Sequence, residues 1–163
     1  MEQSKSVEQQ LVELLAKRNL VITTAESCTG GLVCGKIVNV AGASEVFRGG
    51  YITYSNKQKR NVIGVKKSTL EKYGAVSEQV AAEMAKGVLE VSKADVAIST
   101  TGIAGPGGGT PEKPVGLVYI GCAVKNKVYV EKFNFSGSRN KVRESTVVAA
   151  LSMVRKYVSS EYN

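Results

Sequence analysis

Residues 21–33 carry the pattern that decides the fold, and they read Val21-Ile22-Thr23-Thr24-Ala25-Glu26-Ser27-Cys28-Thr29-Gly30-Gly31-Leu32-Val33. An apolar run ends in small hydroxylated residues, turns at two glycines and resumes as a second apolar segment. This order predicts a strand, a tight turn and a helix. Such a turn places Ser27 near a helix N-terminus, where backbone amides and the helix dipole favour a phosphate or a developing oxyanion. Ser27 is therefore a candidate nucleophile, and the alternative is that Ser27 or Thr29 only caps the helix.

Other short apolar segments predict the remaining strands of a sheet. The predicted strands are residues 20–24, 47–54, 95–101, 117–124 and 128–135. The last two are joined through Lys125-Asn126-Lys127, and Asn126 suits a left-handed position in a hairpin turn. Strands that alternate with helices and then end in a hairpin predict one α/β domain with a mixed sheet covered by helices.

Apolar residues at helical spacing predict the helices of this covering. They are a helix from Val7 that ends before Asn19, one from Leu32 to Gly42, one after Ser55, one from Ser68 to Gly74, one opened by Ser77, and a last helix with Arg139 in its first turn. The helix after Ser77 carries Val80, Met84, Val88 and Val91 on one face, and we expect all four to be buried.

The overall composition fits one globular domain over residues 1–163. Hydrophobic residues make up 43% of the chain and charged residues 22%, which are ordinary values. No apolar run is long enough to span a membrane, and no signal-peptide core follows Met1. The three cysteines, Cys28, Cys34 and Cys122, lack the paired spacing of a metal site, and their odd number fits reduced thiols. We therefore expect a cytoplasmic protein with no metal, cofactor or membrane partner.

The chain contains no histidine. A Ser-His-Asp triad, a Cys-His dyad and a histidine-containing zinc site are therefore all excluded within this chain. Any hydrolytic base must be a lysine, a tyrosine or a carboxylate.

The net charge of +8 is compatible with binding to nucleic acid. Much of it clusters in the middle of the chain, at Lys57, Lys59, Arg60, Lys66, Lys67 and Lys72. No zinc finger, aromatic RNP motif or regular aromatic interleaving accompanies the cluster. A solvated face or a site for one small anion explains these charges at least as well, so we do not expect a nucleic-acid partner.

Lys59 is a candidate base. Ser55-Asn56-Lys57-Gln58 has the Ser-x-x-Gln form of a capping box, which places Lys59 in the first turn of a helix. The positive end of the helix dipole disfavours an ammonium there, and burial lowers the pKa of a lysine further. The alternative is an ordinary surface lysine.

The segment from Gly102 to Gly116 is rich in glycine and holds all three prolines of the chain. It matches neither a Walker A loop nor a dinucleotide-binding turn. Loops of this length are uncommon in compact domains unless they are functional, which favours a binding role over a simple surface connection. Arg139 and Arg143 lie near the N-terminus of the last helix, where cations are unfavourable unless an anion binds, and charge scatter is the alternative.

Five motifs in order along the chain resemble the C-terminal domain family of the competence/damage-inducible protein CinA. They are residues 24–31 (TAESCTGG), 50–56 (GYITYSN) with Lys59, 74–78 (GAVSE), 102–106 (GIAGP) and 113–116 (KPVG). The resemblance covers nearly the whole chain and implies the family's α/β/α sandwich. Longer members carry an N-terminal domain that this chain does not match, so the activity of that domain is not implied.

Stand-alone members of this family include nicotinamide mononucleotide (NMN) amidohydrolases, which act in pyridine nucleotide salvage. The resemblance implies conversion of NMN and water to nicotinic acid mononucleotide and ammonia by a Ser/Lys dyad. It assigns Ser27 as the nucleophile and Lys59 as the general base, with Tyr54 supporting them. We expect backbone amides between Cys28 and Gly31 to hold the oxyanion, and we expect substrate to contact Thr29, Gly30, Gly31, Thr101, Gly102, Gly105, Arg139 and Arg143.

Several alternatives remain open from the sequence. Cys28 adjoins Ser27 and is intrinsically the stronger nucleophile, although a small buried cysteine is the commoner case. Ser138 and Lys141 match the Ser-x-x-Lys pattern of penicillin-recognising enzymes, without the other motifs of that class. A non-catalytic nucleotide- or DNA-binding module associated with competence or DNA damage is the rival function. The hairpin edge suits a homodimer.

Overall fold

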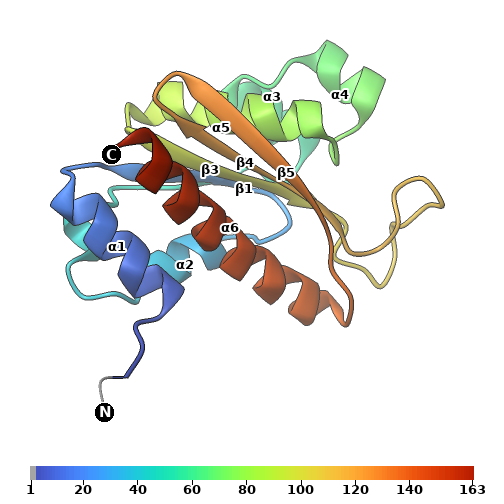
Figure 1. Ribbon diagram of the computed structural model, residues 1–163. Coiled ribbons are helices and arrows are strands. Elements are labelled where there is room, and N and C mark those ends of the chain that lie inside the picture. Colours follow the sequence, from blue (N-terminus) through green and yellow to red (C-terminus); the bar gives the residue numbers. More distant parts are fainter. Residues whose placement is uncertain (1–2) are drawn as a thin grey trace.

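A five-stranded mixed sheet forms the centre of the computed structural model, which describes residues 3–163 (Figure 1). The strand order is β2-β1-β3-β4-β5, with β1 at Ile22–Glu26, β2 at Tyr51–Ile52, β3 at Val96–Gly102, β4 at Leu117–Val124 and β5 at Lys127–Asn134. Strand β1 runs parallel to both of its neighbours, whereas β4 is antiparallel to β3 and to β5. The predicted mixed sheet is confirmed.

Helices cover both faces of this sheet (Figure 1). Helices α1 (Val7–Lys17), α2 (Leu32–Val38) and α6 (Arg139–Glu161) pack together on one face. Helix α5 (Glu78–Ser92) lies on the other face and contacts α3 (Asn56–Ile63) and α4 (Lys67–Tyr73). A short 3-10 helix, η1 (Ala43–Glu45), follows α2. The predicted α/β class, with a sheet between two helical layers, is therefore confirmed.

Each layer has its own apolar core because successive side chains of a strand point to opposite faces. Val96 and Ile98 of β3 belong to the core beneath α1, α2 and α6. Ala97, between them, belongs to the core beneath α5 together with Val80 and Met84. The two fully buried helix residues are worth roughly 1.5–3 kcal/mol each, which fixes α5 on this face.

The structure corrects several predicted boundaries. The segment 47–54 forms only a two-residue strand, Tyr51–Ile52, preceded by an isolated bridge at Phe47. The helix after Ser27 ends at Val38 rather than at Gly42, and α4 begins at Lys67 without the predicted Ser68 cap. Val91 of α5 is 48% exposed, because the helix extends beyond the sheet contact that buries Val80, Met84 and Val88.

The predicted hairpin between β4 and β5 is confirmed, with Asn126 in a left-handed position, but the turn has two residues rather than three because Lys127 begins β5. Lys125 and Asn126 both have positive φ, at 47° and 63°. This conformation matches the type I′ turn, whose twist suits the flanking strands.

Candidate active site

Three parallel strands end at the same edge of the sheet, and the predicted site residues gather there. Glu26, the last residue of β1, is paired with Ile52 of β2 and with Thr100 of β3. The segments that follow these strands begin at Ser27, Thr53 and Ile103. Ligands of α/β proteins bind outside the carboxyl ends of parallel strands, so the topology itself marks this edge as the candidate site.

The structure brings Ser27 and Lys59 together across 32 residues of sequence. The Nζ atom of Lys59 lies 3.0 Å from the Oγ atom of Ser27. It also donates to the backbone carbonyls of Thr53 and Tyr54, at 2.9 Å each. A neutral amine would keep both N–H bonds to the carbonyls and direct its lone pair at the Ser27 hydroxyl, which is the arrangement of a general base beside a nucleophile.

Lys59 is fully buried, which is unusual for a lysine, and only 1% of the residue is exposed. Ser55 caps α3 by accepting a hydrogen bond from the Gln58 amide, so Lys59 occupies the first turn as expected. Burial away from water lowers the pKa of Lys59 from 10.5 to about 8. A substantial fraction of the side chain is therefore neutral near physiological pH.

Tyr54 contributes to this pair through its backbone rather than its ring. Its carbonyl oxygen accepts from Lys59 Nζ, and it lies 3.4 Å from Ser27 Oγ. The side chain is exposed, although the residue lines the neighbouring cavity. Substitution of the ring alone leaves the carbonyl in place.

The N-terminus of α2 is occupied by a carboxylate that belongs to the protein. Glu26 is fully buried and accepts hydrogen bonds from the amides of Gly31, Val33 and Cys34. The N-cap residue is Gly31, which makes no side-chain cap, so neither Ser27 nor Thr29 caps this helix. The expected anion site at the helix terminus is already filled, which leaves the Gly31 amide engaged with Glu26.

Two amides beside Ser27 remain available. The Gly30 amide donates to the Ser27 carbonyl at 3.2 Å, whereas the amides of Cys28 and Thr29 find no acceptor among residues 3–163. Free backbone N–H groups next to a nucleophile are the usual donors of an oxyanion hole. Within the expected segment from Cys28 to Gly31, this narrows the candidates to Cys28 and Thr29.

A cavity of about 340 Å³ adjoins the Ser27–Lys59 pair. The glycine-rich loop forms one wall of it, with Gly102, Ala104 and Gly105 in the lining, and Arg139 also lines it. Arg139 donates to the Gly105 carbonyl at 2.8 Å and is otherwise exposed. Thr101 is buried and bonds instead to the carbonyl of Ala75, so it supports the wall rather than lining it.

Arg143, one turn further along α6, is held differently. Its Nε atom donates to the Cys28 carbonyl at 3.0 Å, and its Nη2 atom donates to the Thr29 carbonyl at 3.1 Å. It is not part of the lining of the 340 Å³ cavity. Arg139 and Arg143 therefore do not form a common site.

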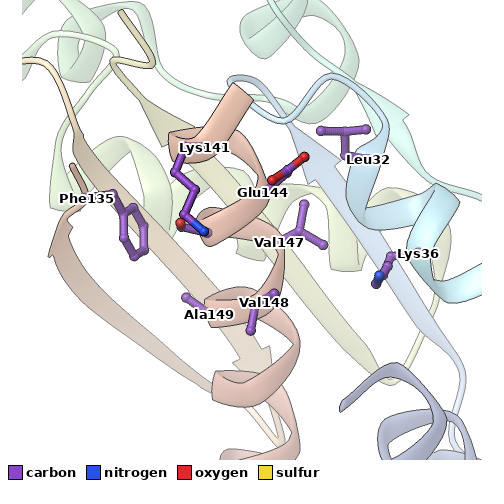
Figure 2. Close-up of a pocket in the computed structure, with 9 residues that line it drawn as sticks. Leu32, Lys36, Phe135, Lys141, Glu144, Val147, Val148 and Ala149 are labelled. Atoms are coloured by element: carbon purple, nitrogen blue, oxygen red, sulfur yellow. The ribbon is translucent and has the colours of Figure 1, made fainter. Parts of the chain in front are cut away.

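A larger cavity of about 700 Å³ lies elsewhere, between α6, α2 and the end of β5. Figure 2 shows Val147, Val148 and Ala149 of α6 along it, with Leu32 of α2 and Phe135 nearby. Its lining is mostly apolar and contains none of the predicted site residues. Ser145, Lys141 and Glu144 also line it, but among residues 3–163 no hydrogen bond joins the Ser145 hydroxyl to either neighbour, so the smaller cavity is the candidate active site.

The comparison with known families decides the relationship of the chain. The model of the CinA C-terminal domain matches residues 4–158. The chain belongs to the CinA C-terminal domain family. A protein of Clostridium tetani described as competence-damage inducible is 56% identical over 153 residues, and one of Thermoanaerobacter pseudethanolicus is 54% identical over 154. These matches cover 94% of this chain but only 37% of each relative, so the chain spans little more than a third of their length.

Solved structures of the CinA family share the fold. A competence/damage-inducible protein from Agrobacterium tumefaciens is 41% identical with a TM-score of 0.86, covering 94% of this chain and 97% of that one. A CinA superfamily protein from Klebsiella pneumoniae 700603 is 31% identical with a TM-score of 0.91, covering 94% and 96%. The resemblance seen in the sequence motifs is therefore confirmed for family and fold.

Cys28, Cys34 and Ser138 are other nucleophilic side chains of this CinA domain. Burial raises the pKa of the Cys28 thiol to about 11, and burial together with the Glu26 charge raises that of Cys34 to about 12. Ser138 Oγ accepts from the Lys141 amide at 3.2 Å, so this serine is the N-cap of α6. Within residues 3–163, no three metal-ligating side chains cluster, and no helix combines the length and apolarity needed to cross a membrane.

Two contributions to this CinA-family site were missed by the sequence reasoning. The first is the Thr53 carbonyl, which accepts a hydrogen bond from Lys59 and cannot be predicted from sequence because every residue has a backbone carbonyl. The sequence prediction does not include Glu26, although α2 starts without a Ser, Thr, Asn or Asp cap, which is the signal that another acceptor satisfies its amides.

Proposed function

We propose that this chain hydrolyses the carboxamide of NMN to give nicotinic acid mononucleotide and ammonia. The observation that carries the proposal is the 3.0 Å hydrogen bond between buried Lys59 and Ser27. Membership of the CinA C-terminal domain family supports the choice of NMN, through the motifs that this chain shares with the family's amidohydrolases. The absence of histidine supports a lysine as the base.

Acylation begins with proton transfer. Neutral Lys59 takes the Ser27 hydroxyl proton as Oγ forms a bond to the carboxamide carbon. The carbonyl π electrons move onto oxygen and give a tetrahedral oxyanion. The free amides of Cys28 and Thr29 hold this charge, and one such donor is worth on the order of 3 kcal/mol in well-studied serine hydrolases.

Collapse of the intermediate breaks the carbon–nitrogen bond. The Lys59 ammonium returns its proton to the departing nitrogen, so that ammonia leaves and Ser27 carries a nicotinoyl ester of the nucleotide. A water molecule then loses a proton to Lys59 and attacks the ester, and the released Ser27 oxygen recovers that proton. The dyad ends the cycle in its starting state.

The 5′-phosphate of NMN requires a cationic partner in the same cavity. Arg139 lines that cavity together with Ser27, and its bond to Gly105 uses one of its five N–H donors. Arg143 is left out of this phosphate site because its guanidinium already bonds two carbonyls. The glycine-rich wall lets the nucleotide approach the backbone closely.

The test is ammonia release from NMN by purified protein, with Ser27→Ala as the control. We expect wild-type release that falls by about 10³-fold or more in Ser27→Ala and nearly as far in Lys59→Ala, because dyad members act as a unit. Release that equals the Ser27→Ala background rejects the assignment. Near-normal turnover in Lys59→Ala removes Lys59 as the base.

A second candidate is a non-catalytic nucleotide- or DNA-binding module. Its support is the net charge of +8 and the names of relatives described as competence-damage inducible. A binding module of this kind should bind DNA with an affinity that falls steeply with added salt, and it should not turn over NMN. Both properties can be measured on the same preparation.

A further inference from the structure

Arg143 of α6 bonds to the turn after Ser27. Phosphate binding does not explain this residue, because it does not line the cavity beside Ser27. Its guanidinium bridges two consecutive carbonyls, those of Cys28 and Thr29, at 3.0 and 3.1 Å. These contacts span 115 and 114 residues of sequence. A planar fork with fixed N–H directions restrains both peptide groups at once, which a flexible lysine would not do.

The orientation of these carbonyls determines where the adjacent amides point. In a trans peptide the C=O and the following N–H lie on opposite sides of the chain. The Cys28 carbonyl faces Arg143, so the Thr29 N–H is directed away from it. Thr29 is fully buried, yet its amide finds no acceptor among residues 3–163. A buried N–H without a partner is costly and commonly has a functional reason.

The other side of the turn is held by Glu26. The Thr29 hydroxyl lies 2.7 Å from a Glu26 carboxylate oxygen and 2.8 Å from the Thr100 hydroxyl. Gly30 between these contacts has φ +53°, and a Cβ there would lie 3.3 Å from Nη2 of Arg143. The turn is therefore held on two sides: residues of the sheet bond to the Thr29 side chain, and Arg143 of α6 bonds to the backbone carbonyls.

We propose that Arg143 is a positioning residue, which, opposed by Glu26, fixes the Cys28–Thr29 turn so that the free Thr29 amide, beside that of Cys28, serves as a preformed oxyanion hole. This inference rests on the proposed amidohydrolase function, since it assigns the electrostatic part of that reaction. Arg143 makes no hydrogen bond to the dyad within residues 3–163 and does not line the cavity beside Ser27. It acts through the peptide groups that it orients.

The expected consequence is a selective loss of turnover. Arg143→Met removes the guanidinium donors but keeps an unbranched apolar stem. We expect kcat for NMN to fall about 10²-fold, the usual effect of losing one oxyanion donor. KM should stay close to the wild-type value, and the kcat/KM profile should keep its inflection near pH 8 because Lys59 is untouched. Arg155→Met, on an exposed face of the same helix, is the matched control.

A fluorophosphonate probe separates this inference from the NMN assignment. Ser27 Oγ would form a bond to phosphorus as fluoride leaves and Lys59 takes the hydroxyl proton, and the phosphoryl oxygen would lie in the oxyanion hole. We expect Arg143→Met to slow labelling by about the same factor as kcat. If the wild type is labelled but does not turn over NMN, and Arg143→Met slows the labelling, NMN is rejected as the substrate and the positioning role of Arg143 is retained.

Other outcomes would contradict the positioning role of Arg143. Wild-type turnover and labelling rates in a folded Arg143→Met protein would overturn the positioning role and leave the amidohydrolase intact. A raised KM with unchanged kcat would instead make Arg143 a substrate ligand. A wild type that neither turns over NMN nor is labelled overturns both. If the methionine variant does not fold, Arg143→Lys, which retains the charge without the fork, takes its place in the same comparison.

Discussion

The Nζ atom of Lys59 lies 3.0 Å from Ser27 Oγ, at a position where 1% of the lysine is exposed. Burial lowers the pKa of this amine to about 8, and the two backbone carbonyls it meets accept from it whether it is charged or neutral. The three contacts therefore set the position of the amine and the direction of its lone pair, whereas burial sets its protonation state.

The first prediction concerns the pH dependence of activity. Lys59 accepts the Ser27 proton only when neutral, so kcat/KM for NMN should rise with pH and level off above about 8. Below that value it should fall about tenfold for each pH unit, because the neutral fraction falls by that factor. Initial rates of ammonia release between pH 6 and 9.5 measure this. Lys59→Arg, which stays charged, should be inactive throughout, and activity in that variant would contradict the mechanism.

The second prediction concerns stability. The pKa of Lys59 is about 8 in the folded protein against 10.5 ordinarily, so above pH 8 the unfolded chain binds more protons than the folded one. The cost of burying the ammonium is therefore fully present below pH 8 and is relieved as pH rises towards 10.5. The free energy of unfolding of wild type, relative to Lys59→Met, should increase by about 1–3 kcal/mol between pH 7.5 and 10.

Urea unfolding at a series of pH values measures this difference, and groups that titrate in both proteins cancel. Lys57→Met on the exposed side of α3 should show no such trend relative to wild type. A flat difference for Lys59→Met would mean that the buried amine is not perturbed.

The third prediction separates Ser27 from its neighbour Cys28. Burial raises the pKa of the Cys28 thiol to about 11, so almost no thiolate exists at pH 7.5. Cys28→Ala should keep NMN turnover within about fivefold, against a loss of about 10³-fold for Ser27→Ala. Iodoacetamide at pH 7.5 should inactivate the wild type slowly. Rapid inactivation that Cys28→Ala prevents would point to the thiol as the nucleophile.

The fourth prediction tests Arg139 as the phosphate ligand. A hydrogen bond to a charged group is worth about 1.5–3 kcal/mol, so Arg139→Gln should raise KM for NMN about 10- to 100-fold. The wild type should also prefer NMN over the nucleoside that lacks the phosphate, and the variant should lose this preference. Lys141→Gln, an exposed cation of the same helix outside this cavity, is the control. An unchanged preference in Arg139→Gln would place the phosphate elsewhere.

The fifth prediction concerns the support of α3, the helix that carries Lys59. Gly87 of α5 packs against its end, since a Cβ at this position would lie 1.9 Å from the Ile63 carbonyl oxygen. Gly87→Ala should therefore lower the free energy of unfolding by about 1–3 kcal/mol and reduce turnover by displacing α3.

Gly35 of α2 provides the matched substitution, because a Cβ there meets no atom within 4 Å. Gly35→Ala should stabilise the protein by up to about 1 kcal/mol, since alanine is the better helix former. Urea unfolding and NMN turnover of both variants measure the contrast. Equal effects of the two substitutions would show that the contact with Ile63 does not hold α3.

The sequence alone determined the α/β class and the order of most elements, and it indicated Ser27 and Lys59 as candidate nucleophile and base. Periodicity marks strands and helices because their repeats differ, and the absence of histidine left few bases for Ser27. The boundaries of the helices and strands depend on more than local sequence. The segment 47–54 has strand composition, but only Tyr51–Ile52 finds pairing beside β1, because pairing depends on a neighbour that local composition does not specify.

Only the tertiary structure decided which contacts these side chains make. It placed Lys59 against Ser27, directed Glu26 into the amides of α2, and separated Arg139 from Arg143 by bonding the second to the Cys28–Thr29 turn. Each of these contacts joins a side chain to backbone or to a residue distant in sequence. Such pairings are set by how β1, α3 and α6 meet at the sheet edge, and a linear pattern does not contain them.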